Sequence, residues 1–386
     1  MQTTGDQHLV KKINKSIVLD SIIRSHPLSR AQLSEMTGLN KGTVSALVSE
    51  LIDERLVYEI GLGTSSGGRK PVMLVFNRSA GYAIGIDIGV RYVLAVLTDL
   101  GGRTIAERRV EPDRSDADSV LDAIVETVRA LTAQAPDSPY GVVGAGVGVA
   151  GIVDDRGAVL FAPNLEWENV ELKRLLEERL GFPVMVDNEA NAGALGELQF
   201  GAGKEATDIV YLSVGTGIGA GIVIGGRLAK GAGGFSGEIG HTTIETNGKK
   251  CRCGNKGCWE QYASESAALE LAAPLGVDRF DRLVELAGAD APEAIRLFHQ
   301  VGESLGIGIA GIVNTFNPEL ILIGNQMTLA EPWIRSAVER VVAARSLPFH
   351  RRQAQIRFAS LGDRSTVSGA AFVAVSAFLT KDRVTL

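Results

Sequence analysis

The sequence predicts an α/β protein in which an N-terminal winged helix-turn-helix precedes a duplicated α/β domain with a central cleft. Three observations support this fold class. The first eighty residues contain three helical patterns followed by two apolar strands around a Gly/Ser turn. Two later segments share one strand-and-turn pattern, and helical stretches separate the strands that follow. We therefore expect a DNA-binding domain at 1–80, a first α/β half at 81–200 and a second half at 201–386.

The first eighty residues contain the start and stop signals of two helices joined by a tight turn. A first helical pattern stops at Pro27. In "LSRAQLSEMTGLN", Ser29 can cap a helix, Gln32 completes a capping box, and Gly38 ends the helix. Asn40 is a suitable cap for the helix that follows. That helix has one apolar stripe, formed by Val44, Leu47, Val48, Leu51 and Ile52.

The side chains opposite this stripe suit close approach to DNA because they are small or polar. Two apolar strands follow, and the turn between them has the basic tip of a β-wing, which can reach a phosphate. The alternative is a small helical bundle that packs on the body. We expect operator DNA as the partner, contacted by Ser29, Arg30, Asn40, Lys41, Gly42, Thr43, Ser45, Ser49, Arg69 and Lys70.

The charge is unevenly distributed along the chain. The net charge is −6, but residues 1–80 contain 10 Lys and Arg against 7 Asp and Glu. The first part therefore carries +3 and the remainder −9. A basic arm on an acidic body suggests a polyanion partner for the arm alone, and chance variation is the alternative.

The rest of the chain has the composition of a globular protein. It is 45% hydrophobic and 22% charged over 386 residues. No stretch has the roughly 18 consecutive apolar residues of a membrane span, and the N-terminus lacks the layout of a signal peptide. We expect a cytoplasmic protein with no membrane partner.

The sequence after residue 80 predicts a body of two similar halves. Tyr82–Glu107 and Ile209–Gly231 each pattern as strand, glycine turn, strand and Gly-Gly-Arg turn, with helical stretches such as Ser119–Gln134 and Leu172–Leu180 between later strands. A duplicated α/β domain would have a ligand cleft where loops of both halves converge. Two unrelated α/β units are the alternative. The loop "GTGIG" at Gly215–Gly219 can cradle a phosphate, although glycines also mark tight turns.

Three segments, "GTGIGAGIVIGGRL", "GFSGEIGH" and "CRCGNKGCWEQYAS", resemble the signatures of the ROK family of repressors and sugar kinases. The resemblance covers nearly the whole chain, and the winged segment with "DNEANAGALGE" is most similar to the xylose repressors of the family. It implies an actin-like, sugar-kinase-like fold for the two halves. It also implies a sugar effector, with D-xylose favoured, and a homodimer, with a tetramer as the alternative.

Three departures from the kinase motifs predict that the protein is not an enzyme. The phosphate loop has Val90 and Arg91 where kinases resembling this chain have a hydroxyl and a lysine. Glu189 stands at the catalytic aspartate, and its extra methylene displaces the carboxylate. Asn325 starts a bulkier segment where those kinases have glycines. We expect a sugar-responsive transcriptional repressor that D-xylose releases from its operator. The alternatives are an ATP-dependent sugar kinase and a plain sugar-binding module.

The resemblance assigns six residues to the sugar hydroxyls. Carboxylates and amides make the strong, directional hydrogen bonds that identify hydroxyls. Each acid could instead be a solvated surface charge or a helix cap. The candidates are Asn164, Asn188, Glu189, Glu238, His241 and Glu260.

All three cysteines of the chain lie close together, at Cys251, Cys253 and Cys258. Thiolates are soft ligands, and three of them with one imidazole make a closed, structural Zn²⁺ site. The resemblance implies His241 as the fourth ligand, and glycines permit the turn between the cysteines. Reduced, unliganded thiols are the alternative. We expect the ion to fix the nearby Glu260 and to leave the second imidazole nitrogen for a sugar hydroxyl.

Overall fold

The computed structural model describes residues 7–62 and 71–380. Its N-terminal domain has the predicted order of three helices and a β-hairpin. The helices are α1 (Gln7–Ser25), α2 (Arg30–Thr37) and α3 (Lys41–Asp53), and the sheet is β1 (Leu28–Ser29), β3 (Val72–Phe76) and β2 (Val57–Leu62). Arg69 and Lys70, which we predicted at the tip of the hairpin, lie outside the described residues.

The predicted helix ends of this domain are confirmed. Ser29 accepts a hydrogen bond from the backbone N–H of Gln32, whose side chain accepts from Ser29 in return. Gly38 ends α2 in the left-handed region at φ 70°, and Asn40 caps α3 by accepting from the N–H of Thr43 at 2.8 Å. The predicted apolar stripe of α3 packs into the core of the domain, although Ile52 is only partly buried.

The first half of the body is built on a five-stranded sheet of order β11-β7-β4-β5-β6. Helix α4 starts two residues before the predicted stretch because Asp116 caps it. The strands are β4 (Tyr82–Ile88), β5 (Val93–Asp99), β6 (Thr104–Val110), β7 (Val142–Val149) and β11 (Val184–Asn188). Beside them lie α4 (Ala117–Thr132), α5 (Leu172–Leu180) and a small sheet of β8 (Ile152–Val153), β9 (Val159–Ala162) and β10 (Trp167–Val170).

The second half repeats this topology, which confirms the predicted duplication. In each half an antiparallel meander of three strands is followed by two strands that add in parallel. The second sheet is β14 (Arg227–Leu228), β13 (Ile218–Ile224), β12 (Ile209–Val214), β15 (Leu320–Gly324) and β16 (Gln355–Phe358). Its helices are α7 (Glu260–Ala263), α8 (Glu265–Ala272), α9 (Phe280–Gly288), α10 (Pro292–Phe316), α11 (Glu331–Arg345) and α12 (Pro348–Gln353).

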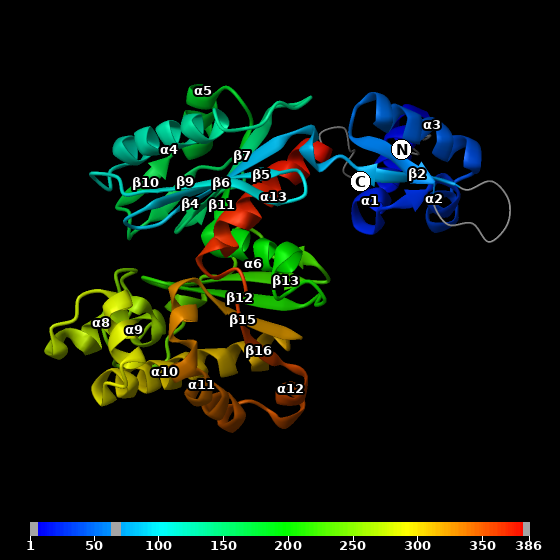
Figure 1. Ribbon diagram of the computed structural model, residues 1–386. Coiled ribbons are helices and arrows are strands. Elements are labelled where there is room, and N and C mark those ends of the chain that lie inside the picture. The colour runs from blue at the N-terminus through cyan, green and yellow to red at the C-terminus, as the bar shows by residue number, and fades with distance from the viewer. Residues whose placement is uncertain (1–6, 63–70, 381–386) are drawn as a thin grey trace.

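Two helices cross between the halves (Figure 1). Helix α6 (Glu189–Phe200) follows the last strand of the first sheet but packs on β12 and β13 of the second. Helix α13 (Ser365–Thr380) follows the last strand of the second sheet but packs on β4 and β7 of the first. Glycines permit this close packing, since a Cβ at Gly146 would lie 1.9 Å from the carbonyl oxygen of Ala370.

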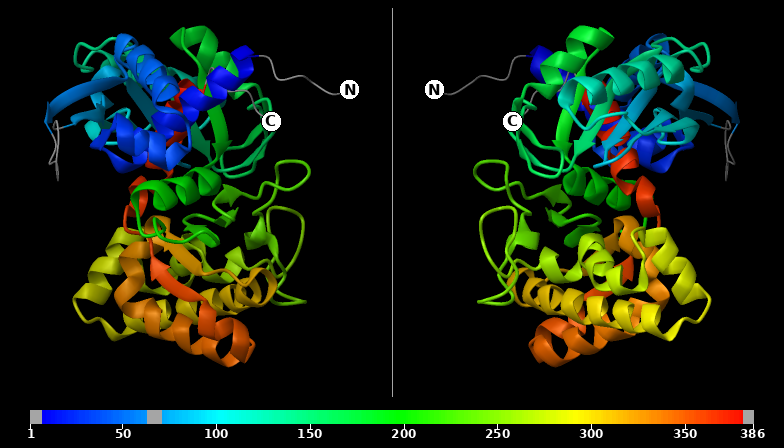
Figure 2. Two further views of the ribbon diagram at one scale, coloured as in Figure 1. Left: turned by 90° about the vertical axis from the view of Figure 1, so that its right-hand side faces the viewer. Right: turned by 90° about the vertical axis from the view of Figure 1, so that its left-hand side faces the viewer.

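The predicted division of the body at residue 200 stays a proposal. Helix α13 lies within the expected second half, yet its C-terminal end joins the core of the N-terminal domain through Ala374 and Val375. Figure 2 shows the N-terminal helices beside the first half and away from the second. Among residues 7–62 and 71–380, no helix is long and apolar enough to cross a membrane.

Candidate functional site

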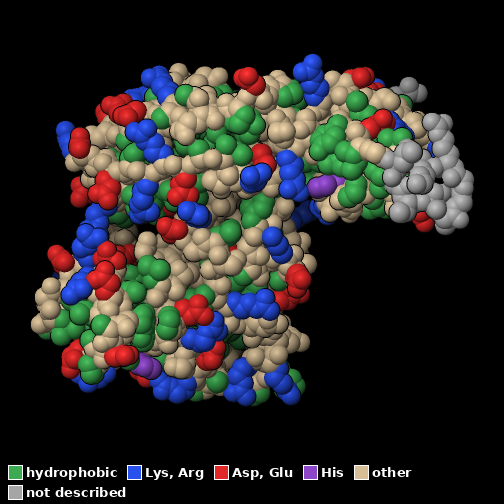
Figure 3. Space-filling view, in the orientation of Figure 1, with side chains coloured by type: hydrophobic (Ala, Val, Ile, Leu, Met, Phe, Trp, Pro, Cys, Tyr) green, Lys and Arg blue, Asp and Glu red, His purple; other side chains and the backbone are tan. Residues whose placement is uncertain are grey.

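A cavity of about 350 Å³ lies between the two halves, at the small end of the range for ligand pockets. The first half lines it with residues of the β4–β5 turn and the β9–β10 loop, and the second half with residues of the glycine loop and the cysteine loop. Figure 3 shows a hollow between the halves, with charged side chains of both signs around it. All six candidate sugar-binding residues line the cavity: Asn164, Asn188, Glu189, Glu238, His241 and Glu260.

Glu189 offers the cavity a carboxyl group without a protein partner. It is the first residue of α6, and its Oε2 atom is buried with no hydrogen-bond partner among the described residues. Burial raises its pKa to about 8, and the neighbouring Glu238 and Asp87 charges act in the same direction. At neutral pH this carboxyl is therefore mostly protonated, so it can both donate to and accept from a sugar hydroxyl.

Replacing Glu189 with Gln should change how stability depends on pH. The folded state holds the proton up to about pH 8, whereas the unfolded carboxyl releases it near its usual pKa of 4.5. The contribution of this carboxyl to the free energy of unfolding therefore falls as pH rises between these values. Glu189→Gln removes this pH-dependent fall. We expect the stability of the variant relative to wild type to rise by up to about 4 kcal/mol from pH 5 to pH 8, measured by urea unfolding. An equal pH dependence of the two proteins would contradict the raised pKa.

The two asparagines of the cavity have structural partners. Asn188 caps α6 by accepting from the N–H groups of Ala190 and Asn191, and its amide donates to the carbonyl of Gly151 at 3.0 Å. One amide hydrogen remains for a ligand. The Asn164 oxygen accepts from Arg252 of the cysteine loop at 3.4 Å, so this pair joins the two halves across the cavity.

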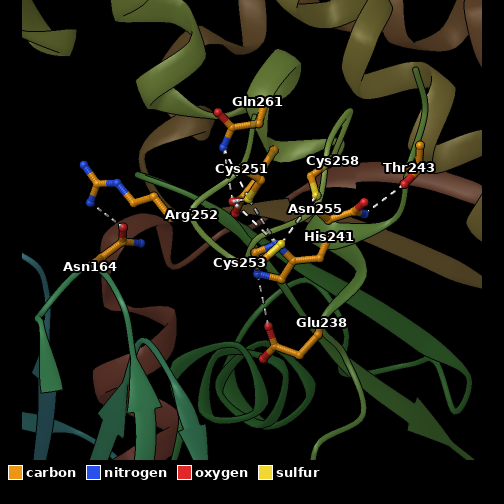
Figure 4. Close-up of polar contacts among 11 residues, drawn as sticks. Asn164, Glu238, His241, Thr243, Cys251, Arg252, Cys253, Asn255, Cys258 and Gln261 are labelled. Atoms are coloured by element: carbon orange, nitrogen blue, oxygen red, sulfur yellow. Dashed lines mark hydrogen bonds and ion pairs between the residues drawn. The ribbon is translucent and has the colours of Figure 1, made fainter. Parts of the chain in front are cut away.

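The three cysteines and His241 converge on one point (Figure 4), and their ligand atoms all lie within 4.8 Å of one another. The Cys253 and Cys258 sulfurs are 3.7 Å apart, and the Cys251 sulfur is 3.6 Å from His241 Nδ1. Zn–S bonds of about 2.3 Å in a tetrahedron place two sulfurs about 3.8 Å apart. This cluster could therefore hold a metal ion.

Backbone turns bring these ligands together as predicted. Gly254 has φ 92° and Gly257 has φ 72°, both in the left-handed region that favours glycine. The buried Trp259 follows the last cysteine and donates from its indole to the carbonyl of Ser304, which fastens the loop to α10. His241 Nδ1 faces the sulfurs, whereas Nε2 lies 3.7 Å from Glu238 Oε2 in the cavity wall.

Glu260 lies between the cluster of His241 and the cysteines and the cavity. Its Oε1 is 3.1 Å from the Cys251 sulfur and 3.6 Å from His241 Nδ1. The other carboxylate oxygen points at Gly217, where an added Cβ would lie 2.7 Å away. A change at the cluster would therefore move a carboxylate that lines the cavity.

The loop that resembles a phosphate loop is closed by a tyrosine. Tyr92 donates its hydroxyl hydrogen to Asp87 Oδ2 at 2.9 Å, and a Cβ at Gly89 would lie 2.3 Å from its ring. The guanidinium of Arg109 lies 3.8 Å above the same ring. Burial raises the pKa of Asp87 to about 7 despite the hydrogen bond from Tyr92, so the carboxylate is less available to a cation. Asn325 donates to the Ser213 hydroxyl beside Gly215.

Most of the predicted DNA-contacting residues lie on one exposed surface at the start of α3. Asn40, Lys41, Gly42, Ser45 and Ser49 are exposed there, and Thr43 is partly exposed. Neither α2 nor α3 has an acidic residue in its first turn. The first residue of each helix is basic, Arg30 in α2 and Lys41 in α3. A cation at a helix N-terminus opposes the helix dipole, which indicates that these positions serve something other than stability.

Ser29 and Arg30 are less available to DNA than the other predicted contact residues. Ser29 is 4% exposed and its hydroxyl is engaged in the capping box, so burial argues against the predicted DNA contact. Arg30 forms an ion pair with Glu59 at 2.7 Å, which it would have to leave to reach a phosphate.

Sequence analysis missed two residues of the cavity region. Arg252 was passed over although it lies between Cys251 and Cys253 of the candidate metal cluster. No local pattern showed that Tyr92 turns back onto Asp87, because this contact depends on how the β4–β5 hairpin closes.

Two like halves with crossed helices, a cavity between them and an added N-terminal domain define an actin-like, sugar-kinase-like protein with a regulatory extension. The chain belongs to the ROK family, whose model matches residues 83–377. A xylose repressor of Bacillus spizizenii is 42% identical, with 97% of this chain and 98% of that protein covered.

Two solved structures show the same architecture. A ROK family transcriptional regulator, a homologue of the Escherichia coli MLC protein, has a TM-score of 0.83 at 29% identity and covers 98% of both chains. A ROK glucokinase of Streptomyces griseus in complex with glucose and AMPPNP has a TM-score of 0.69 at 34% identity. It covers 77% of this chain and all of its own, so the glucokinase matches only part of the present protein.

Proposed function

We propose that this protein is a transcriptional repressor that D-xylose releases from its operator. One observation carries the proposal. The same chain has an exposed surface at the start of α3, where the first residue is Lys41, and a cavity lined by side chains that can bind sugar hydroxyls. The xylose repressor similarity extends over both parts, which supports a joint function. A DNA partner also favours the cytoplasm.

The N-terminal domain is proposed to act as a winged helix-turn-helix. Helix α3 would enter the major groove with its N-terminal turn, and the hairpin of β2 and β3 would reach the phosphate backbone. A homodimer would place one such domain on each half of a pseudo-palindromic operator, and a tetramer is the alternative. D-xylose would close the halves and move the two domains out of operator spacing. By thermodynamic linkage, operator DNA must then weaken D-xylose binding by the same factor.

The test is operator binding with a panel of sugars. DNA fragments selected by the protein from random sequence would be titrated by fluorescence anisotropy with D-xylose, L-arabinose, D-glucose or N-acetylglucosamine. We expect D-xylose to weaken binding at least tenfold and the other sugars to do so much less. Operator affinity that no sugar changes would overturn the proposal, and release by a different sugar would overturn the assignment to D-xylose.

Replacing Lys41 with Ala should lower the salt dependence of operator binding. Lys41 is exposed at the first position of α3, where it would neutralise one DNA phosphate. Loss of one phosphate contact lowers the slope of log affinity against log salt by about one. The measurement is anisotropy from about 50 to 200 mM salt. Lys204→Ala, an exposed lysine of the second half, is the control. An unchanged slope for Lys41→Ala would remove Lys41 from the interface.

The His241 and cysteine cluster is proposed to hold a structural Zn²⁺ ion. The ligand set fits because one imidazole and three sulfurs, at separations close to those of a tetrahedron, complete the shell that structural zinc prefers. Such an ion would supply a fixed point for the loop and no position for a reacting water. His241 Nε2 and Glu260 would then be held facing the cavity.

The second candidate function is an ATP-dependent sugar kinase, which the similarity to the Streptomyces griseus glucokinase favours. Several contacts oppose it. Tyr92 engages the Asp87 carboxylate, Glu189 stands at the start of α6, and Asn325 lies against the glycine loop. Protein mixed with ATP, magnesium and each sugar should release no ADP above background in a coupled assay. Sustained turnover would reverse the choice between the two functions.

A further inference from the structure

Tyr140 connects the body to the end of helix α3. It lies just before β7 in the first half, and its hydroxyl donates to the carbonyl of Glu54, the C-terminal cap of α3, at 2.8 Å. Its backbone N–H donates to the carbonyl of Ala80, which ends the segment that links the N-terminal domain to β4. The last carbonyls of a helix need partners from outside it, so this hydrogen bond helps to orient α3.

The Tyr140 ring also contacts the C-terminal end of α13. Its centroid lies 5.0 Å from that of Phe378 in an edge-to-face arrangement. Nearby on α13, Ala374 and Val375 are buried in the core of the N-terminal domain. Thus α13 reaches α3 in two ways. Ala374 and Val375 join the apolar core that also contains α3, and Phe378, Tyr140 and the Glu54 carbonyl form a second route that ends in a hydrogen bond.

The other end of α13 lies at the wall of the cavity. Thr366 donates its hydroxyl hydrogen to the backbone carbonyl of Glu189, whose side chain lines the cavity. Ser365 donates to the buried carboxylate of Glu197 at 2.8 Å, so the first turn of α13 is fastened to α6 at two points. A movement of α6 on ligand binding would therefore displace this end of α13.

Helix α13 is long and packs closely against the first sheet. Its 16 residues span roughly 24 Å. Its backbone rests directly on two strands of the first sheet, because Cβ atoms at Gly85 and Gly146 would lie 2.0 and 1.9 Å from its carbonyl oxygens. Figure 1 shows α13 running from beside α6 towards the N-terminal domain. Such close packing leaves little room for local adjustment, so a displacement at one end is passed to the other.

We propose that Tyr140 is the positioning residue through which α13 transmits occupancy of the cavity to helix α3. This proposal rests on the sugar-responsive function proposed above. It adds the route from the cavity to the N-terminal domain and the last contact on that route, between Tyr140 and α3. In the sugar-free state, the Tyr140 hydroxyl holds α3 in the orientation that binds the operator. A shift of α13 moves the Tyr140 ring through Phe378 and thereby tilts α3.

The experiment measures the ratio of operator affinities without and with D-xylose for full-length protein. Tyr140→Phe removes the hydroxyl hydrogen bond and keeps the ring, whereas Phe378→Leu keeps apolar volume and removes the edge-to-face contact. Each should reduce the ratio at least threefold, while D-xylose binding to free protein, measured by calorimetry, stays within twofold of wild type. Phe349→Leu, which changes an exposed phenylalanine on α12, is the control and should leave the ratio unchanged.

The double variant tests whether the two residues act in one route. Contacts in series should be non-additive, so the double variant should lose no more of the ratio than the larger single variant. Ratios like wild type in both single variants, or additive losses in the double variant, would overturn the inference. A wild-type protein that no sugar releases would instead overturn the proposed function, so the two failures are distinguishable. Far-UV circular dichroism and the unfolding midpoint verify that each variant is folded.

Discussion

Replacing Cys253 with serine is expected to remove the metal and abolish the response to D-xylose while leaving operator binding intact. Cys253 belongs to the cluster that could hold a metal ion, and it also lines the cavity. Serine is a poor ligand for a metal site built from thiolates. Metal affinity should therefore fall by more than the about 10–100-fold loss caused by replacing residues that hydrogen-bond to metal ligands. Without the ion, His241 and Glu260 would lose their fixed orientation towards a sugar. The core of the N-terminal domain contains none of the cluster residues, so this domain should still bind DNA.

Metal content after dialysis against a chelator, with operator anisotropy with and without D-xylose, measures both effects. The matched control is Lys256→Ser, which alters an exposed residue of the same loop that offers no ligand atom to the cluster. That variant should keep one metal ion per chain and a normal response. A Cys253→Ser protein that retains its ion, or that responds normally without one, would refute the coupling between cluster and cavity.

Replacing Glu197 with alanine is expected to destabilise the protein by at least about 3 kcal/mol. This α6 carboxylate is 0% exposed and accepts from the N–H groups of Ala202, Ser360 and Leu361 and from the hydroxyls of Ser360 and Ser365. Alanine would leave several buried donors without acceptors at the point where α6 meets the start of α13. Each unsatisfied donor costs about 1–3 kcal/mol.

Urea unfolding of Glu197→Ala against wild type measures this loss, and Glu205→Ala, an exposed glutamate shortly after α6, controls for the loss of a charge. Glu197→Gln should recover part of the stability because an amide oxygen still accepts hydrogen bonds. A loss below about 1 kcal/mol for the alanine variant would show that the buried network relaxes at little cost.

Features with local causes were predictable from the sequence. The caps at Ser29 and Asn40 and the end of α2 at Gly38 depend on residues within one helical turn. The duplication was visible because each half repeats the same spacing of strands and glycine turns, and both sheets have matching order. The cysteine cluster was predictable because its three sulfurs come from one short loop and its turns need glycine.

The candidate site was only partly predictable. The six candidate sugar residues come together around one cavity, yet the resemblance, not their spacing, suggested that grouping. Sequence could not show that Ser29 is buried in β1 beside β3, or that Arg30 is paired with Glu59. Both depend on how the helices of the N-terminal domain meet its hairpin.

The sequence by itself determined the order of the helices and strands, their ends and the cysteine loop. Residues close together along the chain make the contacts that define these features. Only the tertiary structure decided that α6 and α13 exchange sheets and that Tyr140 contacts helix α3. The Tyr140 and Glu54 partners are 86 residues apart. Hydrophobic periodicity records which face of an element is buried but not which distant surface covers it, so these contacts depend on the packing of the whole chain.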